Sequence, residues 1–444
     1  AARERDPPAG ACGGLGHLMQ PASVTRRQAL AAAWAIAPGV FVVGLGGGIV
    51  FPILPLIGVE RGLSLAFIGL ILAANRIGRV IANPLVGMLV DRHGGKRMLV
   101  IGLFCEVAVM GVYWLALLSR YPGPLFLVGR LLYGPASAMA FVGGQTLGLL
   151  AGGSEHRGVS GGVVRMALSF GTPAGLVVGG ILAGIFGNST AFGAAMGVAL
   201  IGGVMAWRTV PDLRTVGAAT RRLRQVAANL SDIRIVAVSA LNAVGTFSVT
   251  GILLSTLVLV VDSRHIGFFG LPVETSSGLM LACLLGASAA FTPLAGRLAD
   301  RPHGRAPTAI MGLSVMVVGF AAVGLSRDPV VLLSSLVVIG IGLGSYNLPL
   351  LALISDLAPA DAQGSAVGTL QLFGDGGGTF GPIAGTAAFA AFGAVAPYLA
   401  TAGLLALGLP VAGWLAKIER VAGRLQARPE VSETGSKSSE QTGG

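Results

Sequence analysis

Twelve apolar runs dominate the chain, and each is long enough to cross a lipid bilayer as a helix. A spanning helix needs about 20 predominantly apolar residues to cross a hydrocarbon layer of about 30 Å. The runs reach that length, and short polar loops separate them. We therefore predict spanning helices at residues 34–57, 64–90, 98–119, 124–151, 159–187, 190–207, 235–261, 277–299, 307–326, 329–354, 365–392 and 395–416.

Composition is typical of a membrane protein and excludes an ordinary soluble domain. Hydrophobic residues make up 53% of the chain and charged residues 11%, against about 25% charged residues in a typical soluble domain. Glycine accounts for 70 of the 444 residues, and small residues let spanning helices approach each other closely. We expect an all-α membrane protein of twelve tightly packed transmembrane helices.

Patterns for metal, nucleotide or nucleophilic chemistry do not point to an enzyme. Cys12, Cys105 and Cys283 lie far apart, and two of them fall in predicted spans, so neither a disulfide framework nor a zinc site is expected. The five histidines show no metal-ligand spacing, and no phosphate-binding loop is present in the sequence. We expect no metal, no cofactor and no enzyme activity.

The distribution of basic residues predicts the orientation of the chain. Of 30 lysines and arginines, only Arg61, Arg120, Arg264 and Arg327 lie in loops after odd-numbered spans. Cytoplasmic loops carry an excess of Lys and Arg, so both termini are expected in the cytoplasm. The net charge of +11 is then explained by orientation, and no nucleic-acid partner is expected. The predicted location is the cell (inner) membrane.

The longest polar interval divides the chain into two halves. We predict a cytoplasmic N-terminal tail at 1–33, a six-helix bundle at 34–210, a basic cytoplasmic linker at 211–234, a second six-helix bundle at 235–418 and a disordered cytoplasmic tail at 419–444. The linker is expected to be a solvated connector, and contact of its basic face with anionic lipid headgroups is the alternative.

An internal repeat relates the two halves. The residues Gly87, Asp91, Arg92, Gly95 and Lys96 recur, at a constant offset of 209, as Gly296, Asp300, Arg301, Gly304 and Arg305. In spans five and eleven, at an offset of 206, the glycines Gly162, Gly171, Gly175 and Gly179 recur as Gly368, Gly377, Gly381 and Gly385. A duplicated six-helix unit is the simplest cause. Two pseudo-symmetric bundles suit alternating access, in which a site between them opens to either side in turn.

The segment Gly87–Arg97 resembles the signature loop of the major facilitator superfamily, and the likeness extends from about Trp34 to Ala416. The resemblance implies two six-helix bundles and a cytoplasmic latch between them that stabilises one access state. The latch residues carried over from this resemblance and from the repeat are Gly87, Asp91, Arg92, Gly95, Lys96, Arg97, Gly296, Asp300, Arg301 and Arg305.

Two further motifs resemble those of drug and metabolite antiporters in this superfamily. Arg130 with Gly134 resembles the fourth-helix arginine motif, with Tyr133 where Gln is common, and the resemblance implies proton coupling at Arg130. The glycines of span five resemble the antiporter motif, although Leu176 replaces its usual proline. Span eleven carries the fuller form around Gly381. Packing between helices alone is the other explanation for these glycines.

Two acidic residues lie inside predicted spans and are proton-coupling candidates together with Arg130. These are Glu106 in span three and Asp375 in span eleven. A charge within a span is costly unless it is paired or hydrated, so such residues are functional candidates. The alternative is a permanent structural ion pair, for example between Glu106 and an arginine of span two or four.

Other polar residues in spans are candidates for lining a central substrate cavity. Arg165 and Gln371 are equivalent in the repeat, and Asn75, Arg79 and Asn83 share one helix face. An excess of arginines over acids favours an anionic or zwitterionic substrate if the arginines line one cavity. The full set is Asn75, Arg76, Arg79, Asn83, Gln145, Arg165, Asn242, Tyr346, Asn347 and Gln371.

These features predict a secondary active transporter that exports small organic molecules by proton-coupled alternating access. Its partners are a small-molecule substrate, protons and the lipid bilayer, and it is expected to function as a monomer. One alternative is proton-coupled uptake of a polar or anionic metabolite, favoured by the arginines and by Leu176. Another is a non-transporting membrane sensor or scaffold, which the short soluble segments disfavour.

Overall fold

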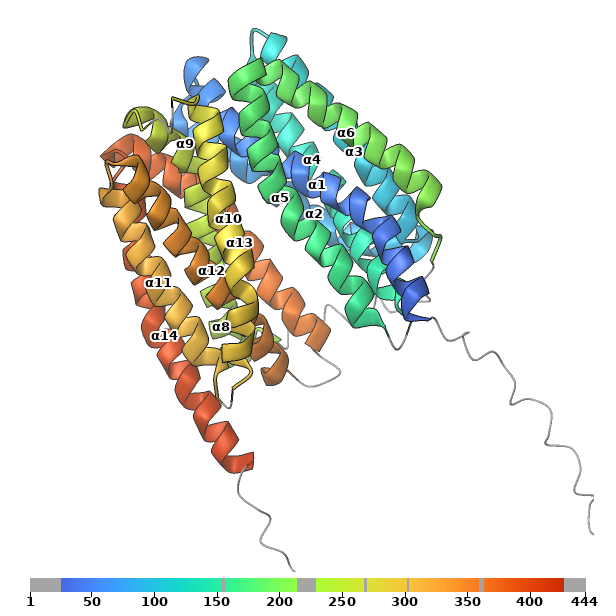
Figure 1. Ribbon diagram of the computed structural model, residues 1–444, viewed down its shortest axis with the longest axis vertical. Helices are drawn as coiled ribbons and strands as arrows, with labels where there is room; N and C mark the ends of the chain where they lie inside the picture. The colour runs from blue at the N-terminus through green and yellow to red at the C-terminus, as the bar shows by residue number, and fades with distance from the viewer. Residues whose placement is uncertain are drawn as a thin grey trace, which may run out of the picture.

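The computed structural model describes residues 25–153, 156–213, 229–266, 270–301, 303–358 and 363–426, and these residues are almost entirely helical (Figure 1). The helices are α1 (Arg26–Glu60), α2 (Leu65–His93), α3 (Gly95–Leu118), α4 (Pro122–Ala151), α5 (Arg157–Phe186), α6 (Asn188–Thr209), α8 (Ile233–Thr246), the π-helix η1 (Phe247–Leu253), α9 (Leu254–Ser263), α10 (Val273–Ala299), α11 (Arg305–Leu325), α12 (Pro329–Leu357), α13 (Gln363–Phe392) and α14 (Ala396–Gln426).

Twelve helical spans result, because α8, η1 and α9 follow one another without a break and form the seventh span. In the described part of the chain, eleven of the spans are long and apolar enough to cross a membrane. The remaining span is α13, whose polar residues and many glycines lower its hydropathy. The prediction of an all-α protein with twelve transmembrane helices is confirmed.

Three spans show the main differences from the predicted ones. The first helix starts at Arg26 rather than at residue 34, because Thr25 and Gln28 form a capping box. The last helix continues to Gln426, so residues 419–426 are helical and not part of a disordered tail. The seventh span was expected to be one regular helix, but it contains η1. Most of the predicted tails and linker lies outside the described residues.

The two halves pack with the same pattern of neighbours. In the first half α1 packs on α5, α2 on α4, and α3 on both α4 and α6. In the second half, the seventh span packs on α13, α10 on α12, and α11 on both α12 and α14. Each helix therefore has the same neighbours as its counterpart six spans later. This equivalence gives two pseudo-symmetric six-helix bundles.

The bundles meet through two helix pairs, α2 with α13 and α5 with α10. Leu56 at the end of α1 packs with Val258 and Leu259 of α9, which closes this end of the molecule. We call it the closed end. Toward the opposite end, where α1 begins and α14 finishes, the bundles diverge (Figure 1). We call it the open end.

Candidate functional site

A cavity of about 210 Å³ lies between the bundles, with residues of both bundles in its wall. A second region of about 340 Å³ adjoins it, and the two share Leu168, Thr172, Thr250 and Leu254. The wall of the first region is mixed, with apolar side chains, hydroxyls and two arginines. Its lining includes Val43, Phe51, Leu72, Asn75, Arg76, Arg79, Tyr133, Ser137, Phe141, Gly378 and Pro382.

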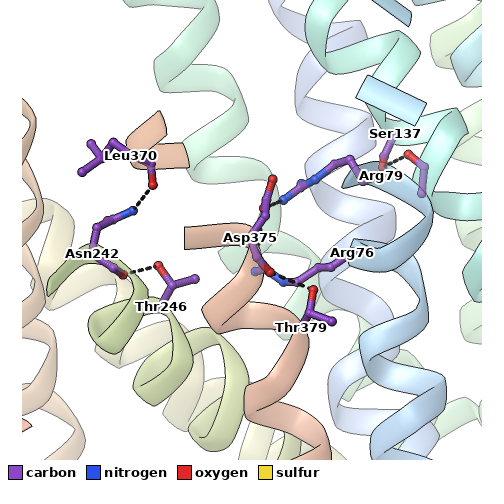
Figure 2. A network of polar contacts seen from close by, with 9 residues as sticks. Arg76, Arg79, Ser137, Asn242, Thr246, Leu370, Asp375 and Thr379 are labelled. Carbon is purple, nitrogen blue, oxygen red and sulfur yellow. Dashed lines mark hydrogen bonds and ion pairs between the residues drawn. The ribbon is translucent and has the colours of Figure 1, made fainter. Parts of the chain in front are cut away.

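An ion bridge joins the two bundles at the cavity wall. Arg76 and Arg79 lie one turn apart on α2, and both donate to the same oxygen, Oδ1 of Asp375 on α13 (Figure 2). The distance from Arg76 Nη1 to this oxygen is 3.2 Å. Gly378, one turn after Asp375, leaves the space that the Arg76 guanidinium occupies, because a methyl group there would collide with it.

The bridge is partly screened from the cavity. The Asp375 side chain is 4% exposed, whereas those of Arg76 and Arg79 are 16% and 25% exposed. Removing one partner of a buried ion pair costs about 3–5 kcal/mol, because the remaining charge is left without compensation. Two arginines against one carboxylate leave one positive charge in the cavity wall. The bridge can therefore hold the bundles together and still attract an anion.

Glu106 on α3 occupies a different environment, in the core of the first bundle. Its side chain is buried, and neither carboxyl oxygen has a hydrogen-bond partner within the described residues. The carboxyl group packs against Gly46 of α1, where any larger residue would collide with it. In the described part of the chain, no ion pair joins Glu106 to an arginine of α2 or α4. The structural ion pair that was the alternative role of Glu106 is therefore not seen there.

Arg130 on α4 is fully buried beside this core. One guanidinium nitrogen donates to the Leu72 carbonyl at 3.3 Å, and the guanidinium carbon lies 5.5 Å from the centre of the Phe51 ring. Its Nε and Nη1 have no hydrogen-bond partner among the described residues. Arg130 is thus held behind Phe51 and does not line the cavity.

The other candidate cavity residues divide into four groups, of which three are described first. Asn75, Arg76, Arg79 and Asn347 line the cavity. Asn242 donates to the Leu370 carbonyl at 2.8 Å and so links α8 with α13 (Figure 2). Along their helices, Asn83, Arg165 and Gln371 lie between the cavity and the open end, with Arg165 and Gln371 exposed.

The fourth group is two candidates that do not line the cavity. Tyr346 is fully buried in the core of the second bundle, and its hydroxyl donates to the Leu241 carbonyl. The prediction that Tyr346 lines the cavity is therefore wrong, because this side chain points from α12 toward α8. Gln145 is half-buried in α4, its Nε2 lacks a partner among the described residues, and it is not part of the cavity lining.

The latch candidates lie at the open end of the molecule. Gly94 connects α2 directly to α3. Its φ is 86°, a backbone conformation that glycine adopts without strain. Asp91, Arg92 and Arg97 are exposed there. In the part of the chain that the structure describes, no ion pair links them to the second bundle.

The repeat of this loop is tied to its own bundle. Arg305 forms an ion pair with Asp356 at the end of α12. The carboxylate of Glu419 on α14 accepts from the backbone nitrogens of Arg305 and Ala306, at 3.2 and 2.9 Å. It thereby caps the start of α11. Asp300 and Arg301 are exposed beside it.

Most of the repeated glycines lie where two helices touch. A methyl group at Gly171, Gly175 or Gly179 of α5 would collide with the main chain of α1. Gly377, Gly381 and Gly385 of α13 face the seventh span in the same way. The first glycine of each set, Gly162 and Gly368, has open space around it.

Sequence reasoning missed the contribution of α1 and α4 to the site. The carboxyl of Glu106 packs on Gly46 of α1, and the hydroxyl of Tyr133 packs on Gly47. The main chain of α5 packs on Gly48. Three consecutive glycines inside an apolar run were the available signal. Tyr133, noted only as a departure from a motif, lines the cavity.

Comparison with known families agrees with this architecture. Residues 36–286 and 269–439 match the family model of the Major Facilitator Superfamily. The chain belongs to this superfamily. The major facilitator superfamily consists of membrane transporters, so the chain is an integral membrane transporter and not an enzyme.

Two curated relatives carry multidrug resistance names, and one of them is named an efflux pump. Multidrug resistance protein 2 of Bacillus subtilis (strain 168) is 30% identical over 171 residues, which are 37% of this chain and 40% of that protein. The chain thus matches less than half the length of that relative. The multi-drug resistance efflux pump PmrA homolog of Lactococcus lactis subsp. lactis (strain IL1403) is 25% identical over 369 residues, 79% of this chain and 86% of that protein.

Solved structures of transporters share the fold. A bacterial homologue of the human lysosomal transporter Spinster, in an inward-facing and occupied conformation, has a TM-score of 0.70 at 15% identity, covering 92% of this chain and 100% of that one. The nucleoside transporter NupG has a TM-score of 0.68 at 14% identity, covering 89% and 98%. At these identities the likeness concerns the major facilitator fold alone.

Proposed function

We propose that this transporter exports small organic molecules in exchange for protons, by alternating access around the cavity between its bundles. The observation that carries the proposal is the bridge from Arg76 and Arg79 to Asp375, since it joins the two bundles at the cavity wall. Export is supported by the curated relative that is named an efflux pump.

The contacts at the closed end support alternating access. Thr275 of α10 donates to the Gly180 carbonyl of α5 at 2.9 Å, which links the bundles above the cavity. The packing of α1 on α9 adds apolar contact there. If the bundles rock, these contacts separate while the latch loops of the open end come together. We propose that the open end faces the cytoplasm and that the chain functions as a monomer in the cell membrane.

The cavity wall supports small organic substrates with both apolar and polar parts. Phe51, Leu72 and Phe141 provide apolar surface, and Asn75 with the two arginines provides a few convergent polar groups. Ligand sites are mostly apolar with a small number of placed polar groups.

Purified protein in liposomes tests the proposal. The probes are ethidium, a cation, and carboxyfluorescein, an anion, each followed by fluorescence under an imposed pH gradient. We expect at least one probe to move against the proton gradient in wild-type protein, and Asp375→Asn to abolish that movement. Ser169→Asn is the matched control, since Ser169 is the repeat equivalent of Asp375. Movement of the probe in the same direction as protons would contradict export by exchange.

The second candidate function is proton-coupled uptake of an anionic metabolite. It is favoured by Arg76 and Arg79, which place two positive charges against one carboxylate in the cavity wall. An anion that binds these arginines would compete with Asp375, and protonation of Asp375 would assist its binding. Proton and anion would then move together, so an inward pH gradient that drives carboxyfluorescein in the same direction supports this alternative.

A further inference from the structure

We infer that Glu106, and not Asp375, holds the proton that is exchanged during transport, and that the Tyr133 hydroxyl connects Glu106 with the cavity. The inference rests on the proposed proton coupling and identifies its site. It follows from the contrast between the surroundings of the two acids.

Asp375 is already held in an ion bridge in this conformation. Arg76 and Arg79 both donate to one of its oxygens. Separating the carboxylate from these two arginines in a largely buried place is costly. Asp375 therefore serves as an ionic contact between α2 and α13.

Glu106 has the opposite environment. It is 1% exposed, it packs on Gly46, and its two oxygens lack hydrogen-bond partners within the described residues. An isolated ionised carboxylate in such a place is far more costly than a neutral acid. The carboxyl group therefore carries its proton in this conformation.

Few other titratable groups face Glu106. From α4 come Tyr133 and Arg130, and α3 itself contributes Tyr113. Arg79 of α2 lines the cavity together with Tyr133. Residues 42–49 of α1, where Gly46 lies against Glu106, contain no titratable side chain. Neither do residues 191–199 of α6, where Phe192 lies against Tyr113. Arg130 is not within ion-pair distance of Glu106 in the described structure, so Glu106 has no fixed counter-charge.

Tyr133 provides the route between Glu106 and the cavity. It lines the cavity, and its hydroxyl packs on Gly47 while the Glu106 carboxyl packs on the adjacent Gly46. The hydroxyl now donates to the Val43 carbonyl at 2.7 Å. For release, the Glu106 carboxyl donates its proton to the Tyr133 oxygen while the phenolic proton passes to a water molecule in the cavity. The result is a Glu106 carboxylate, a neutral tyrosine and a hydronium ion.

Loss of this proton changes which conformation is stable. A Glu106 carboxylate pressed against Gly46 would be buried without a partner, so deprotonation favours any arrangement that moves α1 away and brings the carboxylate to water or to Arg130. A proton that binds two conformations unequally shifts their populations by that difference. Because α1 packs on α9 of the other bundle at the closed end, its movement is transmitted between the bundles.

The experiment combines infrared spectroscopy with transport. In purified wild-type protein we expect a protonated carboxyl band that Glu106→Gln removes and Asp375→Asn retains. Glu106→Gln should melt at the wild-type temperature, because Gln resembles the protonated acid. Its pH-gradient-driven movement of ethidium or carboxyfluorescein should be at least tenfold slower than that of wild-type protein. Its gradient-free exchange of the probe should stay within twofold of the wild-type rate.

Tyrosine variants test the route. Tyr133→Phe should slow gradient-driven movement more than it slows gradient-free exchange of the probe. Tyr113→Phe is the matched control, since Tyr113 is also a buried tyrosine but does not line the cavity. Gradient-driven transport by Glu106→Gln at the wild-type rate, or a carboxyl band that survives in it, would overturn this inference alone. Absence of gradient-driven transport in wild-type protein would overturn the proposed proton coupling as well.

Discussion

The two contacts between the bundles, α2 with α13 and α5 with α10, share a backbone arrangement but differ in charge. At one contact Gly69 lies against the Pro382 carbonyl, and at the other Gly278 lies against the Leu176 carbonyl. Gly278 is the repeat equivalent of Gly69 at the offset of 209, and Pro382 is that of Leu176 at 206. The duplication has therefore kept the close approach of the helices at both contacts.

Near the cavity the two contacts diverge. Asp375 corresponds to Ser169 at the offset of 206, and Arg76 and Arg79 correspond to Leu285 and Ser288 at 209. One contact thus has an ion bridge where the other has hydroxyl and apolar groups. The close helix packing that the rocking movement needs is therefore common to both contacts, whereas, among the described residues, the ion bridge is found at the contact of α2 with α13 and not at that of α5 with α10.

The largest effect is expected from Asp375→Asn. Without the carboxylate, Arg76 and Arg79 remain as two partly buried charges, at a cost of about 3–5 kcal/mol. Because about 1.4 kcal/mol corresponds to a factor of ten, we expect transport to fall by about 100-fold or more, together with a lower melting temperature. Ser169→Asn at the uncharged contact should change transport by less than about twofold. Equal effects of the two variants would remove the asymmetry between the contacts.

A smaller and symmetrical effect is expected at the closed end. Gly69→Ala and Gly278→Ala each place a methyl group against a carbonyl of the other bundle, and overpacking of this kind costs about 1–3 kcal/mol. Both should increase the thiol accessibility of a cysteine introduced at Leu56, which is buried between α1 and α9. Gly193→Ala, in α6 at a position with open space around it, is the control. An effect from only one of the two glycines would show that the contacts are not equivalent.

The smallest effect separates a structural tyrosine from one at the cavity. Tyr346→Phe removes a buried hydrogen bond to the Leu241 carbonyl and should lower the free energy of unfolding by about 0.5–1.5 kcal/mol. It should leave gradient-driven transport unchanged, in contrast to Tyr133→Phe. Thermal melting and liposome transport of both variants provide the measurement. A transport defect in Tyr346→Phe without loss of stability would contradict a purely structural role and would indicate that Tyr346 lines the cavity.

The fold could be predicted because hydrophobic length alone determines which segments cross a membrane. Repeated residues at fixed offsets then identified the two bundles. The helix ends at Arg26 and Gln426 could not be predicted, since polar helix that projects beyond an apolar run has no hydropathy signal. The π-helix η1 was also missed, and its Gly251 lies against the Gly381 backbone, a contact between distant segments.

The sequence predicted which residues belong to the site, but not which of them pair with each other. Polar groups in apolar runs identified Arg76, Arg79 and Asp375, because charges are rare there. Which charges pair depends on how α2 and α13 rotate to face each other, and sequence periodicity does not give that rotation. For the same reason Tyr346 was placed in the cavity, and the unpaired state of Glu106 was found only in the structure.

Distances between spin labels at the two ends test alternating access most directly. In a background with Cys12, Cys105 and Cys283 replaced by alanine, one pair of labels is placed at Arg97 and Arg301 at the open end, and the other at Phe186 and Phe392 at the closed end. We predict that changing the pH in the presence of ethidium or carboxyfluorescein shortens the first distance and lengthens the second. Distances that stay fixed, or that change in the same direction, would contradict the rocking of two bundles around a shared cavity.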